Sequence, residues 1–376
     1  MTTSTTIKRL QSPSYDPHRS AANDGDQPPG AGSAISAPVF FPVARYRFEF
    51  RATQPIRLPD YAGSMLRGAF GHALRQLACM TRQKECAGCP LIAACPYPAI
   101  FAPVPPANHS LQRFSQVPAP YVIEPPAWGS RVLAAGETLT FHQVLIGRAL
   151  HELALVILAW RRALARGVGA GDGTAELLRV VHCGDTGEHE IHRPELGSIA
   201  AHAQTIALPR LGDGTAGSAA TLRFETPLRL QHNGRALPPE KLQARTLLMA
   251  LTRRASLLAE FHADGPLVGD FAALSAAAAD IREEKSLSWL DWTRFSSRQQ
   301  QKMSLGGVVG SWRLEGALAP FAPFLQLGEW LHVGKEAAFG LGRYRLADDR
   351  QEDISGALDK CRDSQLQVLE RKSEGV

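Results

Sequence analysis

The sequence lacks the features that mark membrane-spanning and secreted proteins. No uninterrupted apolar run approaches the roughly 18 residues that a membrane-spanning helix needs, and the N-terminus contains no hydrophobic signal core. Residues 1–37 are instead rich in Ser, Thr, Pro and Gly, a composition typical of a disordered leader. We therefore expect a cytoplasmic protein with no membrane partner, and the length of 376 residues favours about two domains.

Two common nucleotide-binding signatures are also missing. A Walker loop has four residues between its first Gly and the Gly-Lys pair, followed by Ser or Thr. Here five residues separate Gly328 from Gly334, and Glu336 follows Lys335. A dinucleotide-binding fingerprint follows a strand and opens a helix, whereas this stretch follows a helical pattern and opens an alternating one. Neither class of nucleotide-dependent enzyme fits the sequence.

The same stretch, WLHVGKEAAFGLGRYRL, has the composition of an anion-binding loop. Gly334, Gly340 and Gly342 have no Cβ and can adopt positive φ, so their peptide N–H groups could approach a phosphate closely. Lys335 and Arg343 would add positive charge. The alternative is a glycine-rich turn that only connects a helix to a strand, and the spacing alone does not decide between the two.

Alternating and helical patterns predict the order βαββαβ twice. In the first unit the strands and helices are expected at 46–52, 60–77 with Asp60 as N-cap, 121–124, 139–147, 150–164 and 177–183. In the second unit they are expected at 222–230, 240–262, 287–295, 306–316, 320–330 and 341–346. This order predicts the α+β class with two tandem ferredoxin-like, RRM-like domains. In such domains the helices cover one face of the sheet and the other face can hold RNA.

A weak internal duplication supports the division into two units. The segment LRFETPLRL in the second half is similar to the segment YRFEFRATQPIRL in the first half. A segment rich in Gly, Asp and Ala at 211–220 separates the two halves. The expected organisation is a disordered leader 1–37, an N-terminal domain 38–215 with a cysteine module at 79–97, a C-terminal domain 216–350 and a tail 351–376.

Cys79, Cys86, Cys89 and Cys95 fall within 17 residues, a density that is unusual in a cytosolic chain whose thiols stay reduced. They could form one tetrahedral metal site, although the spacing lacks the two regular CxxC pairs of a zinc ribbon. Structural zinc is the first interpretation. An iron–sulfur cluster and a site that holds no metal are the alternatives.

With these motifs the chain resembles the CRISPR-associated endoribonucleases of the RAMP superfamily that process precursor CRISPR RNA. Tandem ferredoxin-like units with a glycine-rich loop before the last strand mark that family, and HVGKEAAFGLGRY resembles the loop. MLRGAFGHALRQLAC, CAGCPLIAACPYPAIF and WLDWTRFSSRQQQKMSLGGVVG are similar to the subgroup with a zinc-finger-like insertion. The resemblance extends from about Arg45 to Leu346.

The resemblance implies cleavage of CRISPR repeat RNA with no cofactor for catalysis. The 2′-hydroxyl attacks the adjacent phosphate and leaves a 2′,3′-cyclic phosphate and a 5′-hydroxyl, which requires a base of near-neutral pKa and cations around the phosphate. The position in the family points to His72 as the base and Tyr61 as a helper at the start of the same helix, with His109 in reserve. The alternative for His72 is an ordinary exposed helix histidine.

The resemblance also implies that Arg294, Arg298 and Lys302, at the turn between two strands of the second unit, contact the stem of an RNA hairpin. Arg67 and the glycine-rich loop would add further RNA contacts. Guanidinium groups bind phosphate in a bidentate manner, and A-form RNA is recognised mainly through shape and phosphates. A solvated charged turn is the alternative. The net charge of +5 and pI near 9.0 are compatible with a polyanionic partner.

Other motifs and other functions are weighed against this interpretation. The HEIH cluster with His189 and His192 does not have metalloprotease spacing, so a solvated loop is expected there. Trp289 and Trp292 are expected to pack rather than to stack on bases. A non-catalytic RAMP subunit, which binds RNA within a CRISPR effector complex beside other subunits, would have the same fold. An iron–sulfur redox protein built on the four cysteines is an alternative from another class.

Overall fold

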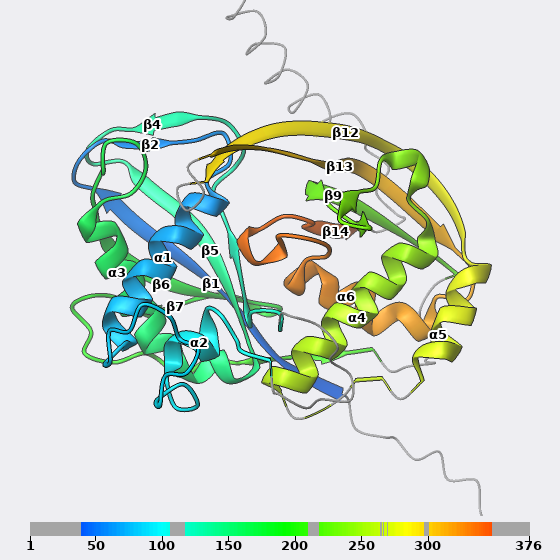
Figure 1. Ribbon diagram of the computed structural model, residues 1–376, viewed down its shortest axis with the longest axis horizontal. Coiled ribbons are helices and arrows are strands. Elements are labelled where there is room, and N and C mark those ends of the chain that lie inside the picture. The colour runs from blue at the N-terminus through cyan, green and yellow to red at the C-terminus, as the bar shows by residue number, and fades with distance from the viewer. Residues whose placement is uncertain are drawn as a thin grey trace, which may run out of the picture. The chain divides into compact units, whose positions relative to one another are not determined.

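The computed structural model describes residues 39–105, 117–209, 218–263, 265, 267–268, 270–296 and 301–347, with backbone alone at 293–296 and 301–305. The helices and strands are arranged around two antiparallel sheets (Figure 1). No helix in these ranges is both long and apolar enough to cross a membrane.

The first sheet has six strands in the order β3-β5-β1-β6-β7, with β8 paired to the start of β1. Its strands are β1 (Val39–Ala52), β3 (Tyr121–Glu124), β5 (Thr138–Ile146), β6 (Ala175–Gly184), β7 (Gly187–His192) and β8 (Thr205–Leu208). The helices α1 (Gly63–Ala78) and α3 (Leu153–Arg166) pack on one face. The order β3-β5-β1-β6 is that of a ferredoxin-like unit.

The second sheet has four strands in the equivalent order β12-β13-β9-β14. They are β9 (Ala219–Leu228), β12 (Arg282–Ser296), β13 (Gln301–Glu315) and β14 (Tyr344–Ala347). The helices α4 (Ala244–His262) and α6 (Ala322–Leu331) share a core with this sheet. The predicted α+β class with two ferredoxin-like units is therefore confirmed.

Short elements lie between the main strands and helices of each unit. They are β2 (Ile56–Leu58) paired with β4 (Arg131–Leu133), β10 (Gln231–His232) paired with β11 (Arg235–Ala236), α2 (Pro96–Ile100), α5 (Phe271–Ala277), and the 3₁₀ turns η1 (Gly147–Glu152), η2 (Pro239–Lys241), η3 (Ala278–Asp280), η4 (Ala319–Phe321) and η5 (Ala337–Phe339). The turn η5 lies inside the glycine-rich stretch.

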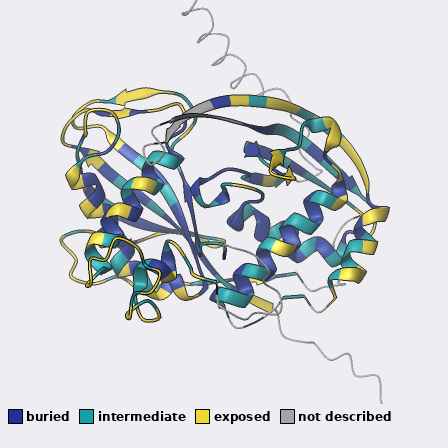
Figure 2. Cartoon of the chain, in the orientation of Figure 1, coloured by how far each residue is buried: buried dark blue, intermediate teal, exposed yellow. Residues whose placement is uncertain are grey.

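Hydrophobic periodicity explains the core of the first unit. Tyr46, Phe48 and Phe50 alternate along β1 and are fully buried, as a strand with one covered face predicts. Leu66 and Phe70, one turn apart on α1, are buried against them. Figure 2 shows buried residues, in dark blue, along the strands of both sheets and on the helix sides that face them.

Two local expectations are corrected by the structure. Asp60 does not cap α1, which begins at Gly63 without a side-chain cap; its carboxylate instead accepts the Ser130 N–H at 3.1 Å and holds the turn before β4. The HEIH segment is not a solvated loop, because its backbone pairs with β6 as strand β7. His192 is buried there, whereas His189 is exposed.

The two units share apolar packing. Residues from the first sheet belong to the same buried cluster as the cores of α4 and α6; they include Phe41, Val43, Val122, Val144, Ile146 and Ile206. The YVIE strand β3, predicted at 121–124, is completely buried for this reason. The second unit therefore covers part of the sheet face that α1 and α3 leave open.

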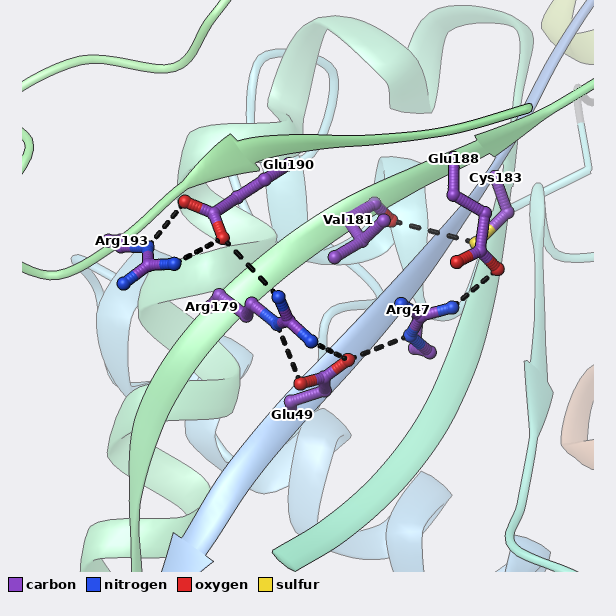
Figure 3. A network of polar contacts seen from close by, with 8 residues as sticks. All are labelled: Arg47, Glu49, Arg179, Val181, Cys183, Glu188, Glu190 and Arg193. Atoms are coloured by element: carbon purple, nitrogen blue, oxygen red, sulfur yellow. Dashed lines mark hydrogen bonds and ion pairs between the residues drawn. The ribbon is translucent and has the colours of Figure 1, made fainter. Parts of the chain in front are cut away.

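The rest of that open face carries a network of paired charges (Figure 3). Arg179 binds Glu49 at 2.7 Å, and Arg47 binds both Glu49 and Glu188. Arg193 continues the network through Glu190. Each drawn arginine has a carboxylate partner on this face.

The shared packing predicts a large difference between two neighbouring phenylalanines of β1. Phe41 is 1% exposed and Phe40 is 58% exposed. We expect Phe41→Ala to lower the free energy of unfolding by about 3 to 5 kcal/mol, and Phe40→Ala to change it by about 0.5 kcal/mol or less. Urea unfolding followed by circular dichroism measures both, and equal losses would show that β1 does not anchor the two units.

Candidate functional site

Three segments that the sequence singled out meet at one place. Tyr61 before α1, Trp292 of β12, and Phe339 and Leu341 of the glycine-rich loop form a small buried cluster, against which Trp128 packs. We refer to these five residues as the junction cluster. Figure 1 shows the β12–β13 hairpin reaching from the second sheet to the first unit, and the ring centroids of Tyr61 and Trp292 are 5.2 Å apart.

Tyr61 holds the loop rather than facing solvent. Its side chain is 5% exposed, and its hydroxyl donates to the carbonyl oxygen of Phe339 at 2.9 Å. Burial raises the pKa of Tyr61 well above its usual range, so the phenol stays a neutral donor near pH 7. In this geometry the hydroxyl is already committed to the loop backbone.

His72 lies elsewhere on α1. Its exposed ring forms a 2.7 Å hydrogen bond between Nε2 and the side chain of Gln76. Gly63, at the start of the helix, touches the loop, because a Cβ there would clash with the Phe339 carbonyl oxygen. His72 follows nine residues later, which is roughly 14 Å along the helix axis. The structure therefore does not bring His72 and Tyr61 together, and His109 lies outside the described residues.

The glycines of the loop are required by the chain's own backbone. Gly342 has φ 69°, and a Cβ would clash with the carbonyl oxygen of Val333. A Cβ on Gly340 would lie 2.5 Å from the Tyr61 hydroxyl, and one on Gly334 would lie 2.7 Å from the Arg229 carbonyl oxygen. At all three positions another part of the chain approaches the backbone so closely that only glycine has room.

Several loop N–H groups expected to face a phosphate donate inward instead. The N–H groups of Lys335, Gly340 and Gly342 bind the carbonyl oxygens of Arg229, Ala337 and Pro227 at 2.8, 3.0 and 3.0 Å. The expected anion cradle is corrected to this extent, because these donors are used to fold the loop. Contact between the loop and RNA remains a prediction, and it would have to be made by the side chains of the loop.

Three of the predicted RNA-binding cations have described side chains. Lys335 is exposed and has no ion pair with any residue in the described ranges. Arg343 binds Glu225 at 2.8 Å and lies 3.8 Å from Glu124. The guanidinium of Arg67 stacks 4.6 Å over the Phe101 ring. Lys335 is thus the cation of these three that is best placed to meet a polyanion.

The arginines of the hairpin are placed by their backbone alone. Arg294 pairs with Met303 and Lys302 with Phe295 near the end of the β12–β13 ladder, whereas Arg298 lies outside the described residues. Trp292, two residues before Arg294, is buried in the junction cluster, which confirms its packing role. Trp289 is 39% exposed.

A buried group of charges beside the loop was not predicted. Glu124 of β3 is 1% exposed and lies 3.0 Å from Arg45 and 3.1 Å from His332. Burial alone would raise the pKa of Glu124, but Arg45, the hydrogen bond from His332 and Arg343 hold it well below its usual range. Burial also lowers the pKa of His332, so a neutral ring donates its Nε2–H to an ionised carboxylate.

The four cysteines of the module line one cavity of about 160 Å³ beside the end of α1. The hydroxyl of Thr81 lies between two of them, 4.0 Å from Cys79 Sγ and 3.5 Å from Cys89 Sγ. Burial would raise the pKa of Cys79, but hydrogen bonds from the Arg82 backbone, Thr81 and Arg75 lower it overall. Throughout the described ranges, no three His, Cys, Asp or Glu side chains are grouped closely enough to hold a metal ion. The thiols share a cavity without converging on one point, so structural zinc remains a prediction.

The zinc prediction is tested by removing two thiols. If the cysteines bind zinc, Cys86→Ser with Cys89→Ser will lower the zinc content and the melting temperature together, since a tetrahedral site does not survive the loss of two ligands. The double variant that remains folded is expected to keep the RNA cleavage that the resemblance implies. Metal analysis and thermal unfolding measure the outcome. Stoichiometric zinc in the double variant would rule out this site, and absorbance near ~400 nm would indicate an iron–sulfur cluster instead.

The steric role of the loop glycines is tested against a glycine in open space. Gly234 has φ 78°, but nothing lies within 4 Å of a Cβ built there. We expect Gly234→Ala to lower the free energy of unfolding by about 1 kcal/mol, the cost of a left-handed alanine. Gly342→Ala adds the clash with Val333 and is expected to cost about 2 to 4 kcal/mol in total. Denaturant unfolding measures both, and equal losses would show that the loop shifts without cost.

Two protein-family models match parts of this chain. Residues 41–204 match the AF_1859 N-terminal domain family, and residues 222–344 match the family of the CRISPR-associated endoribonuclease Cas6. The two ferredoxin-like units with a glycine-rich loop before the last strand agree with the resemblance to the RAMP superfamily. Residues 222–344 of this chain therefore belong to the Cas6 endoribonuclease family.

Several solved structures are similar to this chain at low identity. A Cas6 product complex is 17% identical with a TM-score of 0.51 and covers 81% of this chain and 100% of that one. Thermus thermophilus Cas6 is 15% identical with a TM-score of 0.47, covering 83% and 100%. A RAMP protein that binds different RNA substrates is 11% identical with a TM-score of 0.42, covering 81% and 100%. No sequence match was found among curated proteins.

Proposed function

We propose that this protein is a metal-independent endoribonuclease that binds CRISPR repeat RNA and cleaves precursor CRISPR RNA to mature crRNA. The observation that carries the proposal is the junction cluster, where the start of α1, the glycine-rich loop and the β12–β13 hairpin meet. The match of residues 222–344 to the Cas6 endoribonuclease family supports RNA cleavage as the activity.

The chemistry requires only groups that the chain supplies. A base removes the proton of the 2′-hydroxyl, the resulting oxygen attacks the neighbouring phosphorus, and the bond to the 5′-oxygen breaks. Cations stabilise the additional negative charge on the phosphate in the transition state. We assign the role of base to the exposed ring of His72, and phosphate contacts to Lys335 and to the hairpin residues Arg294 and Lys302.

One observation favours a second function, an RNA-binding RAMP subunit without catalysis. His72 lies roughly 14 Å along the helix from the contact between α1 and the loop, and the Tyr61 hydroxyl is occupied by Phe339. Cleavage by His72 therefore requires the RNA to run along α1 from the junction cluster. A subunit that only binds RNA has no such requirement.

The two functions are separated by incubating the purified protein with labelled repeat RNA in EDTA. The enzyme yields one cut product that ends in a 2′,3′-cyclic phosphate, at a rate that EDTA does not change, because the mechanism uses no metal ion. Binding without a cut product would establish the RNA-binding subunit. Cleavage that EDTA abolishes would reject the metal-independent mechanism.

The same assay tests the base. We expect His72→Ala to slow single-turnover cleavage by about 100-fold or more, the effect of losing one proton-transfer group, with little change in RNA affinity. His151→Ala, an exposed histidine outside α1, serves as the matched control and is expected to cleave normally. Unchanged cleavage by His72→Ala would transfer the role of base to His109 or to an arginine-based mechanism.

A further inference from the structure

The glycine-rich loop begins and ends at the same buried carboxylate. Nε2 of His332, at the start of the loop, lies 3.1 Å from Oε1 of Glu124. Nη1 of Arg343, at the end of the loop, lies 3.8 Å from Oε2 of the same residue. Glu124 belongs to β3 of the first unit, so one carboxylate from the first unit contacts both ends of a loop that the second unit carries.

The carboxylate is itself held in place. Nη2 of Arg45 lies 3.0 Å from Oε1 of Glu124 and also donates to the carbonyl oxygen of Glu329 at 2.8 Å. The guanidinium of Arg45 lies 4.6 Å from the centre of the Trp330 ring. Arg45 therefore connects the first sheet to the end of α6, directly before the loop, and keeps Glu124 ionised between the two units.

The contact with Glu124 is made by a residue whose backbone conformation is unusual. Its φ of 57° lies in the left-handed region, where a residue other than glycine is strained, and its side chain is completely buried. Such strain persists only where the surroundings determine the conformation. Nδ1 of His332 has no hydrogen-bond partner in the described part of the chain, so the contact with Glu124 is the polar contact that fixes the ring.

The middle of the loop is fixed by separate contacts. The hydroxyl of Thr226 donates to the Gly340 carbonyl oxygen at 2.7 Å and accepts the Arg343 N–H at 2.9 Å. Tyr61 holds the carbonyl of Phe339. Lys335 projects from the part of the loop that follows His332 and is exposed. The segment from His332 to Lys335 is thus held at one end by Glu124 and at the other by the Arg229 carbonyl oxygen, which accepts the Lys335 N–H at 2.8 Å.

We propose that Glu124 is a positioning residue for RNA recognition: by binding His332 and Arg343 it sets the conformation of loop 332–343 and so places Lys335 against an RNA phosphate. The proposal rests on the proposed function for its RNA partner. The first part of the proposal is that Glu124 fixes the loop through His332 and Arg343, which we call the clamp. The clamp exists without RNA and can be measured separately.

Glu124→Gln tests the clamp, because the amide has the same shape and lacks the charge. In hydrogen exchange on the RNA-free protein, the amides of Lys335, Gly340 and Gly342 are expected to exchange at least about tenfold faster than in the wild type. Amides of α3, which the clamp does not touch, are expected to be unchanged. Cleavage of repeat RNA is expected to fall about 100-fold, the cost of a misplaced group.

A double-mutant cycle separates positioning from a general structural role. In the wild-type background, Lys335→Ala removes one ionic contact and makes the logarithmic salt dependence of RNA binding shallower by about 0.7 to 0.9. In the Glu124→Gln background the same change is expected to alter the slope little, since Lys335 no longer meets the phosphate. A purely structural contribution of Glu124 would leave the two effects additive.

Two further variants make the test decisive. Glu225→Gln removes the exposed carboxylate that binds Arg343 at 2.8 Å and leaves Glu124 in place, so loop exchange and RNA binding are expected to be near wild type. His332→Asn tolerates the left-handed backbone but is too short to reach Glu124, so it is expected to reproduce Glu124→Gln. It also replaces that variant if Glu124→Gln does not fold.

The proposal is overturned if folded Glu124→Gln or His332→Asn protein has wild-type loop exchange, or if the Lys335→Ala effect persists in full. A wild type that neither binds nor cleaves repeat RNA would reject the proposed function instead. Loop exchange in the RNA-free protein would then still decide whether Glu124 clamps the loop.

Discussion

The apolar contact between the first sheet and the helices α4 and α6 is the constraint on which the remaining structure depends. A ferredoxin-like unit leaves one sheet face uncovered, and here Phe41, Val43 and Ile146 use that face to pack on the second unit. This packing brings β3 beside the glycine-rich loop and buries Glu124. A buried carboxylate is tolerated only with charged partners, which Arg45, His332 and Arg343 supply.

The sequence predicted the elements whose signal is local. The alternation along Tyr46–Ala52 and the helical stripe of Leu66 and Phe70 each reflect one covered face, so both were predicted correctly. The strand β7 was missed because its backbone is recruited by the edge of β6, a long-range pairing that HEIH does not encode by periodicity. Asp60 looked like a helix cap because its distant partner, Ser130, cannot be deduced from local spacing.

The candidate site was predicted in composition but not in arrangement. The glycines at 334, 340 and 342 were predicted to let the backbone approach a phosphate, whereas the neighbours that leave no room for a side chain are carbonyl groups and Tyr61 from elsewhere in the chain. Glu124 was missed because a single acid in the run YVIE looks like the polar side of a short strand. One signal was present: this acid adjoins three residues with apolar bodies in a segment bounded by prolines.

The ion-pair network of Figure 3 has a consequence for how RNA reaches the protein. Arg47, Arg179 and Arg193 are each within salt-bridge distance of Glu49, Glu188 or Glu190, so this surface is locally close to neutral despite its arginine content. An ion pair has no net charge, and salt screens the field that remains beyond the Debye length of about 8 to 10 Å. The network therefore exerts little long-range attraction on a polyanion.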